Sequence, residues 1–389
     1  MFPRIRFTFN RLSRRTFLAA SAGCLVAARS ENQLEQILRS LTLEEKAQLC
    51  HGNVTTVTGD RFASGGVPRL GISQIRMLDG RQGVRTFDKT RTTALPCTLS
   101  LSCTWDPEAA SAFGSLIADE MLALGQNLLL APTMDLMRSP LGGRNFEYLG
   151  EDPFLAGHMA AAYIRGVQSK GVGACAAHLV ANDCETRRHF TSSNMDERTL
   201  RETHLRAFEI CIKEGHVWCM MAGNNLLNGQ HIAANHKLVQ KIVKGELGYD
   251  GVLLTDWRAA YETVPTALGG TDLTTGICAY VFGDNHLLNA VKSGQVPESL
   301  LNDKVRRLLR LYERTGVLKP GSRAKGALET PEHRSLARQF AVDGMVLLKN
   351  DRSLLPINAE HVKTLSVFGP AAEIVPFGGG VVAQVGVIC

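Results

Sequence analysis

Short, continuous apolar runs alternate with amphipathic segments through the middle of the chain. The runs lie at residues 72–78, 127–131, 172–177, 217–222 and 251–255. A strand that is apolar at every position is covered on both faces, which is typical of a parallel sheet. Helical patterns lie between the runs, as at 197–213 and 236–247. The alternation predicts an α/β fold, a (β/α)8-type TIM-like barrel, with an open doubly wound sheet as the alternative.

Polar residues follow these apolar runs. They are Asp79, Arg144, His178, Asn225 and Asp256, with Arg144 in a polar stretch after the second run. In a barrel, the carboxyl ends of the strands build the active site. We therefore expect these five side chains to converge on one mouth of the barrel.

The pattern changes after the barrel region. A helical pattern at 297–312 ends the region that we assign to the barrel, residues 31–318. Residues 319–330 are charged and contain glycine and proline, which predicts a linker. A further helix is expected at 331–343. Residues 331–389 are too few for an independent core, so we expect the start of a truncated α/β sandwich domain.

Two more strands are expected in this last region, at residues 345–348 and 364–368. A truncated domain would leave their apolar edges under-covered, and such edges invite pairing between molecules. Self-association is therefore expected.

The first residues have the three regions of a signal peptide. Arg14 and Arg15 precede an apolar stretch, 17–28, which ends in small residues. This stretch is too short to span a bilayer, and the paired arginines resemble a twin-arginine signal. We interpret residues 1–28 as an export signal, which predicts a periplasmic or extracellular protein without a membrane span. A buried N-terminal helix is the alternative.

Composition narrows the function classes. The chain has 389 residues, of which 44% are hydrophobic, so dominant disorder is excluded. The formal net charge is +6, and five arginines fall within the first fifteen residues, so the body is nearly neutral and no nucleic-acid partner is expected. The ten cysteines include no C-x-x-C pair, which argues against a zinc ribbon, and no disulfide can be assigned.

Asp256 is the strongest candidate for chemistry. It emerges from a buried strand beside Trp257, an aromatic residue that could form a platform for a sugar ring. A helix N-cap is the competing interpretation. The charged stretch 138–152 favours a site, because carbohydrate pockets need bidentate donors and acceptors for vicinal hydroxyls.

Several motifs together resemble glycoside hydrolase family 3, in a β-glucosidase-like form. In chain order they are Asp79-Gly80-Arg81-Gln82-Gly83-Val84-Arg85, Gly143 to Glu147 with Gly150 to Pro153, His178 to Asn182 with Glu185-Thr186, Asn228-Gly229, and Gly251 to Trp257. The similarity begins near Leu41 and includes Leu347 to Asn350 and Leu354 to Pro356.

This resemblance implies a retaining exo-acting β-glycosidase that hydrolyses a terminal non-reducing sugar of an oligosaccharide or glycoside through a covalent glycosyl-aspartate intermediate. It implies that Asp256 is the nucleophile and that neither a metal nor an organic cofactor is needed. It also implies binding residues. Asp79, Arg144 and His178 would hold sugar hydroxyls, and Arg85 and Trp257 would shape the pocket.

Departures from the family pattern accompany the matches. Ala177 stands where the family has lysine, so one cationic donor is expected to be missing. Asn224 stands in place of a tyrosine and Arg81 in place of a proline. No general acid/base can be named. A catalytically weak or inactive carbohydrate-binding homologue is therefore an alternative, and a single-domain hexosaminidase is a third hypothesis.

Overall fold

A computed structural model describes residues 31–53, 62–88, 90–319 and 321–372. The expected export segment, 1–28, lies outside these residues, as do Cys24 and Cys389. The chain divides into two compact units, Met1–Thr42 and Leu43–Cys389. In the first unit, residues 31–40 form a helix. Everything below concerns the second unit.

Helices and strands alternate along the second unit. The α-helices are α2 (Leu43–Leu49), α3 (Thr98–Ser102), α4 (Pro107–Ala123), α5 (Pro153–Ser169), α6 (Glu197–Thr199), α7 (Arg206–Lys213), α8 (Thr263–Gly269), α9 (Ala279–Phe282), α10 (His286–Lys292), α11 (Glu298–Arg314) and α12 (Pro331–Asp343). Two π-helical segments are η3 (Leu200–His204) and η5 (Lys237–Glu246). Single 3-10 turns are η1 (Pro68–Leu70), η2 (Asn145–Glu147), η4 (Ile232–Ala234), η6 (Gly276–Cys278), η7 (Asp351–Ser353) and η8 (Ala359–His361).

The strands form two sheets. They are β1 (Met77–Leu78), β2 (Leu128–Leu129), β3 (Gly173–Leu179), β4 (Ser192–Ser193), β5 (Cys219–Ala222), β6 (Leu226–Leu227), β7 (Gln230–His231) and β8 (Val252–Thr255). The main sheet is parallel in the order β1-β2-β3-β5-β8, and each of the five predicted apolar runs supplies one strand. Strands β4, β6 and β7 make a small second sheet.

Further backbone bonds close the main sheet on itself. Beyond β8, the Thr255 N–H donates to the Leu273 carbonyl at 3.0 Å, and Gly52 N–H donates to the Thr274 carbonyl at 2.8 Å. The Asn53 N–H then donates to the Ala63 carbonyl, and Met77 N–H of β1 donates to the Phe62 carbonyl. This closure confirms the TIM-like barrel prediction, and the open doubly wound alternative is wrong.

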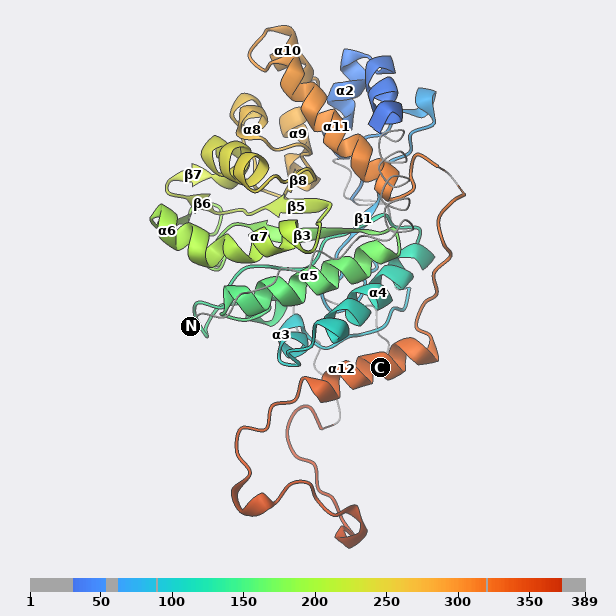
Figure 1. Ribbon diagram of the computed structural model, residues 1–389, viewed down its shortest axis with the longest axis vertical. Helices are drawn as coiled ribbons and strands as arrows, with labels where there is room; N and C mark the ends of the chain where they lie inside the picture. The colour runs from blue at the N-terminus through green and yellow to red at the C-terminus, as the bar shows by residue number, and fades with distance from the viewer. Residues whose placement is uncertain (1–30, 54–61, 89, 320, 373–389) are drawn as a thin grey trace, which may run out of the picture. The chain divides into compact units, whose positions relative to one another are not determined.

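Helices cover the outside of the strands, as Figure 1 shows for α5 and α7 beside β3, and α4 packs against β2 and α5. The Asp152 side chain caps α5 by accepting from the Phe154 N–H, and Pro153 opens the helix. Glycine sets the approach of α4 and α5, because a Cβ at Gly166 would lie 2.0 Å from the Ser111 carbonyl oxygen. Strand β3 is buried along its whole length, as its apolar run predicts.

The predicted helices form with local differences. Residues 197–213 divide into α6, η3 and α7, and residues 236–247 form the π-helical η5 rather than a regular α-helix. The expected helix at 331–343 matches α12 residue for residue. No helix among the described residues is both long and apolar enough to cross a membrane.

The predicted linker is bound to α4. Glu120 is fully buried and its carboxylate accepts from the Glu329 N–H at 3.0 Å, while His333 of α12 lies 3.3 Å from the same carboxylate. The Ala327 N–H donates to Asp119 at 3.2 Å. The linker therefore anchors α12 against the barrel.

The prediction of two strands after α12 is wrong. Residues 345–348 and 364–368 pair with no other segment among the described residues, and Figure 1 shows irregular chain there. Leu348 is 91% exposed and Phe368 is 90% exposed. An extended segment needs partner strands and an apolar surface to pack against, and residues 345–372 supply neither.

Candidate active site

A small cavity of about 120 Å³ opens at the carboxyl edge of the main sheet. Its lining combines residues from several strand ends and loops. They are Asp79, Arg81, Arg144, His178, Glu185, Arg188, Met221, Asp256 and Trp257. Of the six predicted site residues, Asp79, Arg144, His178, Asp256 and Trp257 are thus brought together in one cavity.

The Asp256 carboxylate is buried at the end of β8, with 4% exposure. Its Oδ1 accepts from the Trp257 N–H at 2.6 Å, and its Oδ2 accepts from the Asn224 Nδ2. The helix-cap interpretation is wrong, because the next helix, α8, begins only at Thr263 with Glu262 as its N-cap. The geometry instead leaves a fixed carboxylate at the cavity wall.

His178 links Asp256 to a second buried acid. Its Nδ1 lies 2.9 Å from the Asp135 Oδ2, and its Nε2 lies 3.7 Å from the Asp256 Oδ2. Burial and the nearby Arg144 lower the pKa of His178 well below its usual value, so the imidazole is neutral at pH 7. Burial raises the pKa of Asp135 to about 6. Asp135 also accepts backbone N–H groups from His178 and Asn182, which fixes the ring.

Arg144 is held by the carboxylate of Glu147. Its Nη2 donates to the Glu147 Oε2 at 2.7 Å and its Nε to the same oxygen at 3.2 Å. Its Nη1 lies 3.7 Å from Glu185, which also pairs with Arg188 at 3.1 Å. Burial opposes ionisation of Glu147, but Arg81 and Arg144 outweigh it and hold the pKa of Glu147 below its ordinary value.

Asp79 presents an unused acceptor. Its Oδ1 lies 3.3 Å from the Arg81 Nη1, whereas its buried Oδ2 has no hydrogen-bond partner. Burial raises the pKa of Asp79, and Arg81 and Arg85 oppose the rise. Arg85 lies 3.6 Å from the Oδ2 and stacks on Phe87 at 4.4 Å. Arg85 therefore backs Asp79 and does not line the cavity.

Trp257 forms one wall of the cavity. Its ring stacks on Phe62, with centroids 4.1 Å apart and planes inclined by 14°. Gly276 has φ +56°, and a Cβ there would lie 2.2 Å from the Trp257 ring. Only glycine leaves room for this orientation of the indole.

The predicted convergence fails for Asn225. Its Nδ2 donates to the carbonyls of Val180 and Ala181 at 3.1 and 3.0 Å, and the residue does not line the cavity. Its amide stabilises the loop after β3 instead. The position after an apolar run does not reveal whether a side chain turns toward ligand or backbone.

Four lining residues were not predicted as site residues. They are Arg81, Glu185, Arg188 and Met221. Glu185 stands in a recognised motif, and Arg81 stands two residues after Asp79, between Gly80 and Gly83. The sequence signal that could have identified Arg81 is a charged residue in a tight turn at the end of a strand.

Among the described residues, no group of three His, Cys, Asp or Glu side chains is arranged to hold a metal ion. The described cysteines, Cys50 to Cys278, are all unpaired thiols.

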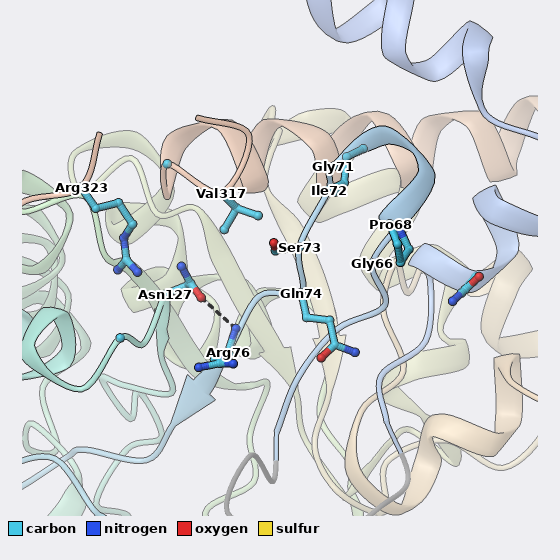
Figure 2. Close-up of a pocket in the computed structure, with 13 residues that line it drawn as sticks. Gly66, Pro68, Gly71, Ile72, Ser73, Gln74, Arg76, Asn127, Val317 and Arg323 are labelled. Carbon is cyan, nitrogen blue, oxygen red and sulfur yellow. Dashed lines mark hydrogen bonds between the residues drawn. The ribbon is translucent and has the colours of Figure 1, made fainter. Parts of the chain in front are cut away.

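A larger cavity of about 700 Å³ lies at the opposite edge of the sheet (Figure 2). Arg76 and Asn127, which precede β1 and β2, line it, and the Arg76 N–H donates to the Asn127 Oδ1 at 3.0 Å. Arg323, also in Figure 2, donates to the Gln126 carbonyl. In barrels this amino edge serves stability rather than chemistry, so size does not identify the site.

Comparison with known proteins gives consistent matches. Residues 65–311 match the family model described as the glycosyl hydrolase family 3 N-terminal domain. Beta-glucosidase B of Emericella nidulans is 38% identical over 354 residues, covering 90% of this chain and 41% of that protein. A beta-glucosidase of Rhizobium radiobacter is 38% identical over 353 residues, covering 89% and 42%.

A solved structure is similar as well. Beta-glucosidase 3B from Thermotoga neapolitana, in complex with α-D-glucose, superposes with a TM-score of 0.78 at 34% identity, covering 84% of this chain and 48% of that one. The chain spans less than half the length of these three proteins.

Proposed function

Since the chain belongs to glycosyl hydrolase family 3, we propose that it carries the barrel part of a retaining exo-acting β-glycosidase of the β-glucosidase type. The observation that carries the proposal is the buried Asp256 carboxylate, fixed by two donors in a cavity with Asp79, Arg144, His178 and Trp257. The names of the relatives support glucosides as the substrate class.

The proposed chemistry has two steps. An Asp256 oxygen attacks the anomeric carbon, the bond from that carbon to the leaving oxygen breaks, and the leaving oxygen takes a proton from an acid. Water then attacks the same carbon, its bond to Asp256 breaks, and a proton of the water returns to the conjugate base of that acid. The described residues do not identify that acid.

The surrounding side chains would position the terminal sugar. Neutral His178 would form a hydrogen bond with one sugar hydroxyl, and Arg144 would donate a hydrogen bond to a sugar oxygen. Asp79 would accept a hydrogen bond from another hydroxyl at its Oδ2. Trp257 would pack its apolar face on the sugar ring, and Arg85 would keep Asp79 in place.

Mechanism-based trapping tests the nucleophile. A 2-deoxy-2-fluoro-β-glucoside with a dinitrophenolate leaving group needs no acid, because this phenolate departs without protonation. The expected result is a fluoroglucosyl adduct on Asp256, located by peptide mass spectrometry. Sugar binding in calorimetry without any adduct would refute the hydrolase and favour the inactive carbohydrate-binding homologue, as would an adduct on another residue.

Export of the protein is a further part of the proposal. Arg14, Arg15 and the apolar stretch 17–28 support it. Residues 1–28 fused to a reporter should direct it across the membrane in a Tat-competent host, and Arg14→Lys with Arg15→Lys should retain it inside.

We also propose that the segment after α12 mediates self-association and belongs to a second domain, residues 331–389, beyond the linker. Met345, Leu348, Leu354, Leu365 and Phe368 each leave more than 70% of their surface exposed, which supports the proposal. Light scattering should detect oligomers, and a monodisperse monomer would contradict it.

A further inference from the structure

We infer that Arg81 is a substrate-binding residue of the cavity, whose free guanidinium edge donates to a sugar hydroxyl next to the hydroxyl held by Asp79. The inference rests on the proposed function and adds a recognition group to it. Arg81 stands in the turn after β1, is only 3% exposed, and lines the cavity.

Three contacts fix the guanidinium and leave one edge unused. The Arg81 Nε donates to the Thr133 Oγ1 at 2.7 Å and lies 3.1 Å from the Glu147 Oε2. Its Nη1 donates to the Asp79 Oδ1 at 3.3 Å. Among the described residues, its Nη2 has no hydrogen-bond partner. A guanidinium held at two nitrogens offers the third in a fixed direction.

The two carboxylates that contact Arg81 each keep an unused acceptor. The Asp79 Oδ2 and the Glu147 Oε1 are both buried without a hydrogen-bond partner. Such groups are costly in a folded protein unless a ligand or water satisfies them. Neighbouring hydroxyls of a sugar can donate to one carboxylate and accept from the adjacent guanidinium. Arg81 and Asp79 together offer this complementary pair.

A purely structural role would have Arg81 neutralise Glu147. Arg81 and Arg144 share that task, since both contact the Glu147 Oε2 and both lower the pKa of Glu147. Arg81 makes this contact through its Nε, so its Nη2 is still available for another partner. A role limited to neutralising Glu147 does not explain why the Arg81 side chain also lines the cavity.

The placement also changes the count of cationic donors. Thr133, which binds Arg81, pairs with Ala177 of β3 in a parallel bridge. Ala177, in place of a lysine, is expected to leave the site one cation short. Arg81 would then supply a cation beside the strand pair that contains Ala177.

The test is a cycle between Arg81 and each sugar hydroxyl. The substrates are 2,4-dinitrophenyl β-glucoside and its 3-, 4- and 6-deoxy analogues, used with wild type, Arg81→Met and Arg81→Lys. We expect kcat/KM for the parent glucoside to fall about 10- to 100-fold in Arg81→Met, as for a lost charged hydrogen bond. With one deoxy analogue the fall should shrink at least about threefold, because its partner hydroxyl is absent.

Arg69→Met is the matched control. Arg69 is an exposed arginine that pairs with Glu45 at 2.7 Å and does not line the cavity. This variant should leave all four rates unchanged. Arg81→Lys keeps the charge near Glu147 and should fold even where Arg81→Met does not, while still losing the hydroxyl-specific coupling.

The outcomes separate this inference from the proposed function. An equal fall with all four sugars would refute the inference, because a structural defect does not distinguish hydroxyls. If the wild type gives no adduct with the fluoroglucoside, the proposed function fails, and the same cycle is run as calorimetric titrations with glucose and the deoxyglucoses. Coupling in binding would then support Arg81 as a hydroxyl donor, and uniform loss would refute it.

Discussion

The two edges of the main sheet both hold buried charged side chains, but the two groups differ in how completely they are hydrogen-bonded. At the amino edge, the Lys244 Nζ donates to Asp272 at 2.6 Å and to the Gly270 carbonyl at 2.8 Å. The other Asp272 oxygen accepts from the Leu253 N–H at 2.9 Å. Lys304 donates to the carbonyls of Ala267 and Thr271. Each of these charged groups finds its partners inside the protein.

The carboxyl edge is incompletely paired. Asp79 lines the Asp256 cavity and keeps a buried oxygen without a hydrogen-bond partner. Glu147, which binds Arg144, and Asn224, which binds Asp256, each keep one as well. A buried polar atom without a partner costs about 1–3 kcal/mol. Unmet hydrogen-bonding capacity thus separates the Asp256 cavity from the cluster of Lys244, Asp272 and Lys304, whereas charge and burial are common to both.

Removing the Asp256 carboxylate should have the largest effect on the carboxyl edge. Asp256→Asn keeps the size of the side chain but loses the nucleophile, so the rate of labelling by the fluoroglucoside should fall by at least about a thousandfold. Rapid-quench mass spectrometry measures this rate. The far-UV spectrum and melting temperature serve as controls for folding, and a labelling rate near wild type would remove Asp256 from the chemistry.

Breaking the amino-edge pair should affect stability instead. Lys244→Met removes the cation that donates to the buried Asp272 carboxylate, which should lower the free energy of unfolding by about 3–5 kcal/mol. Urea unfolding measures it. Lys237→Met on the same helix, η5, is the matched control, because Lys237 pairs with Glu197 at the surface and should cost less than about 1 kcal/mol. Equal losses in both variants would contradict the comparison.

Sequence reasoning captured the elements for a clear physical reason. The five apolar runs have no competing pattern, because a strand covered on both faces has little use for polar residues. The same reasoning placed Asp79, His178 and Asp256 at strand ends that meet in one cavity. Local patterns were sufficient wherever the chain itself supplies the partner surface.

Prediction from the sequence failed where a side chain can choose between several hydrogen-bond partners. Asn225 and Asp256 both follow apolar strands, yet Asn225 turns to loop carbonyls that no local pattern predicts. In the sequence, Arg81 is only a departure from the family pattern. The structure shows that Thr133, which is distant in sequence, accepts a hydrogen bond from its guanidinium. The expected strand at 345–348 failed because apolar residues form a strand only beside another strand.

Weakening one donor to Asp256 should produce an intermediate effect. Asn224→Ala removes the Nδ2 that donates to the Asp256 Oδ2 and also removes the unpaired Asn224 oxygen. A hydrogen bond to a charged group contributes about 1.5–3 kcal/mol, so labelling should slow by about 10- to 100-fold.

Asn228→Ala supplies the control for this variant. The Asn228 side chain bonds the backbone of Met195, at 2.9 Å in both directions, and does not line the cavity. Its labelling rate should stay within about twofold of wild type. A slowing as large as that of Asn224→Ala would assign the effect to general loosening of this loop.

The smallest expected effect is a pH dependence at the amino edge. Burial lowers the pKa of Lys304 from 10.5 to about 8, with Asp272 opposing the fall. Between these two values the unfolded chain binds more protons than the folded protein, so stability rises with pH. The cost of burying the charge is fully present below pH 8 and is relieved as pH rises through 8 toward 10.5.

From pH 7 to pH 9, wild type should gain about 1 kcal/mol relative to Lys304→Met in urea unfolding. Burial also raises the pKa of the neighbouring Cys50 to about 12, which lies above the pH range of this comparison. A difference that is constant between pH 7 and 9 would mean that Lys304 keeps its proton, because its carbonyl partners then stabilise the charge as well as water does.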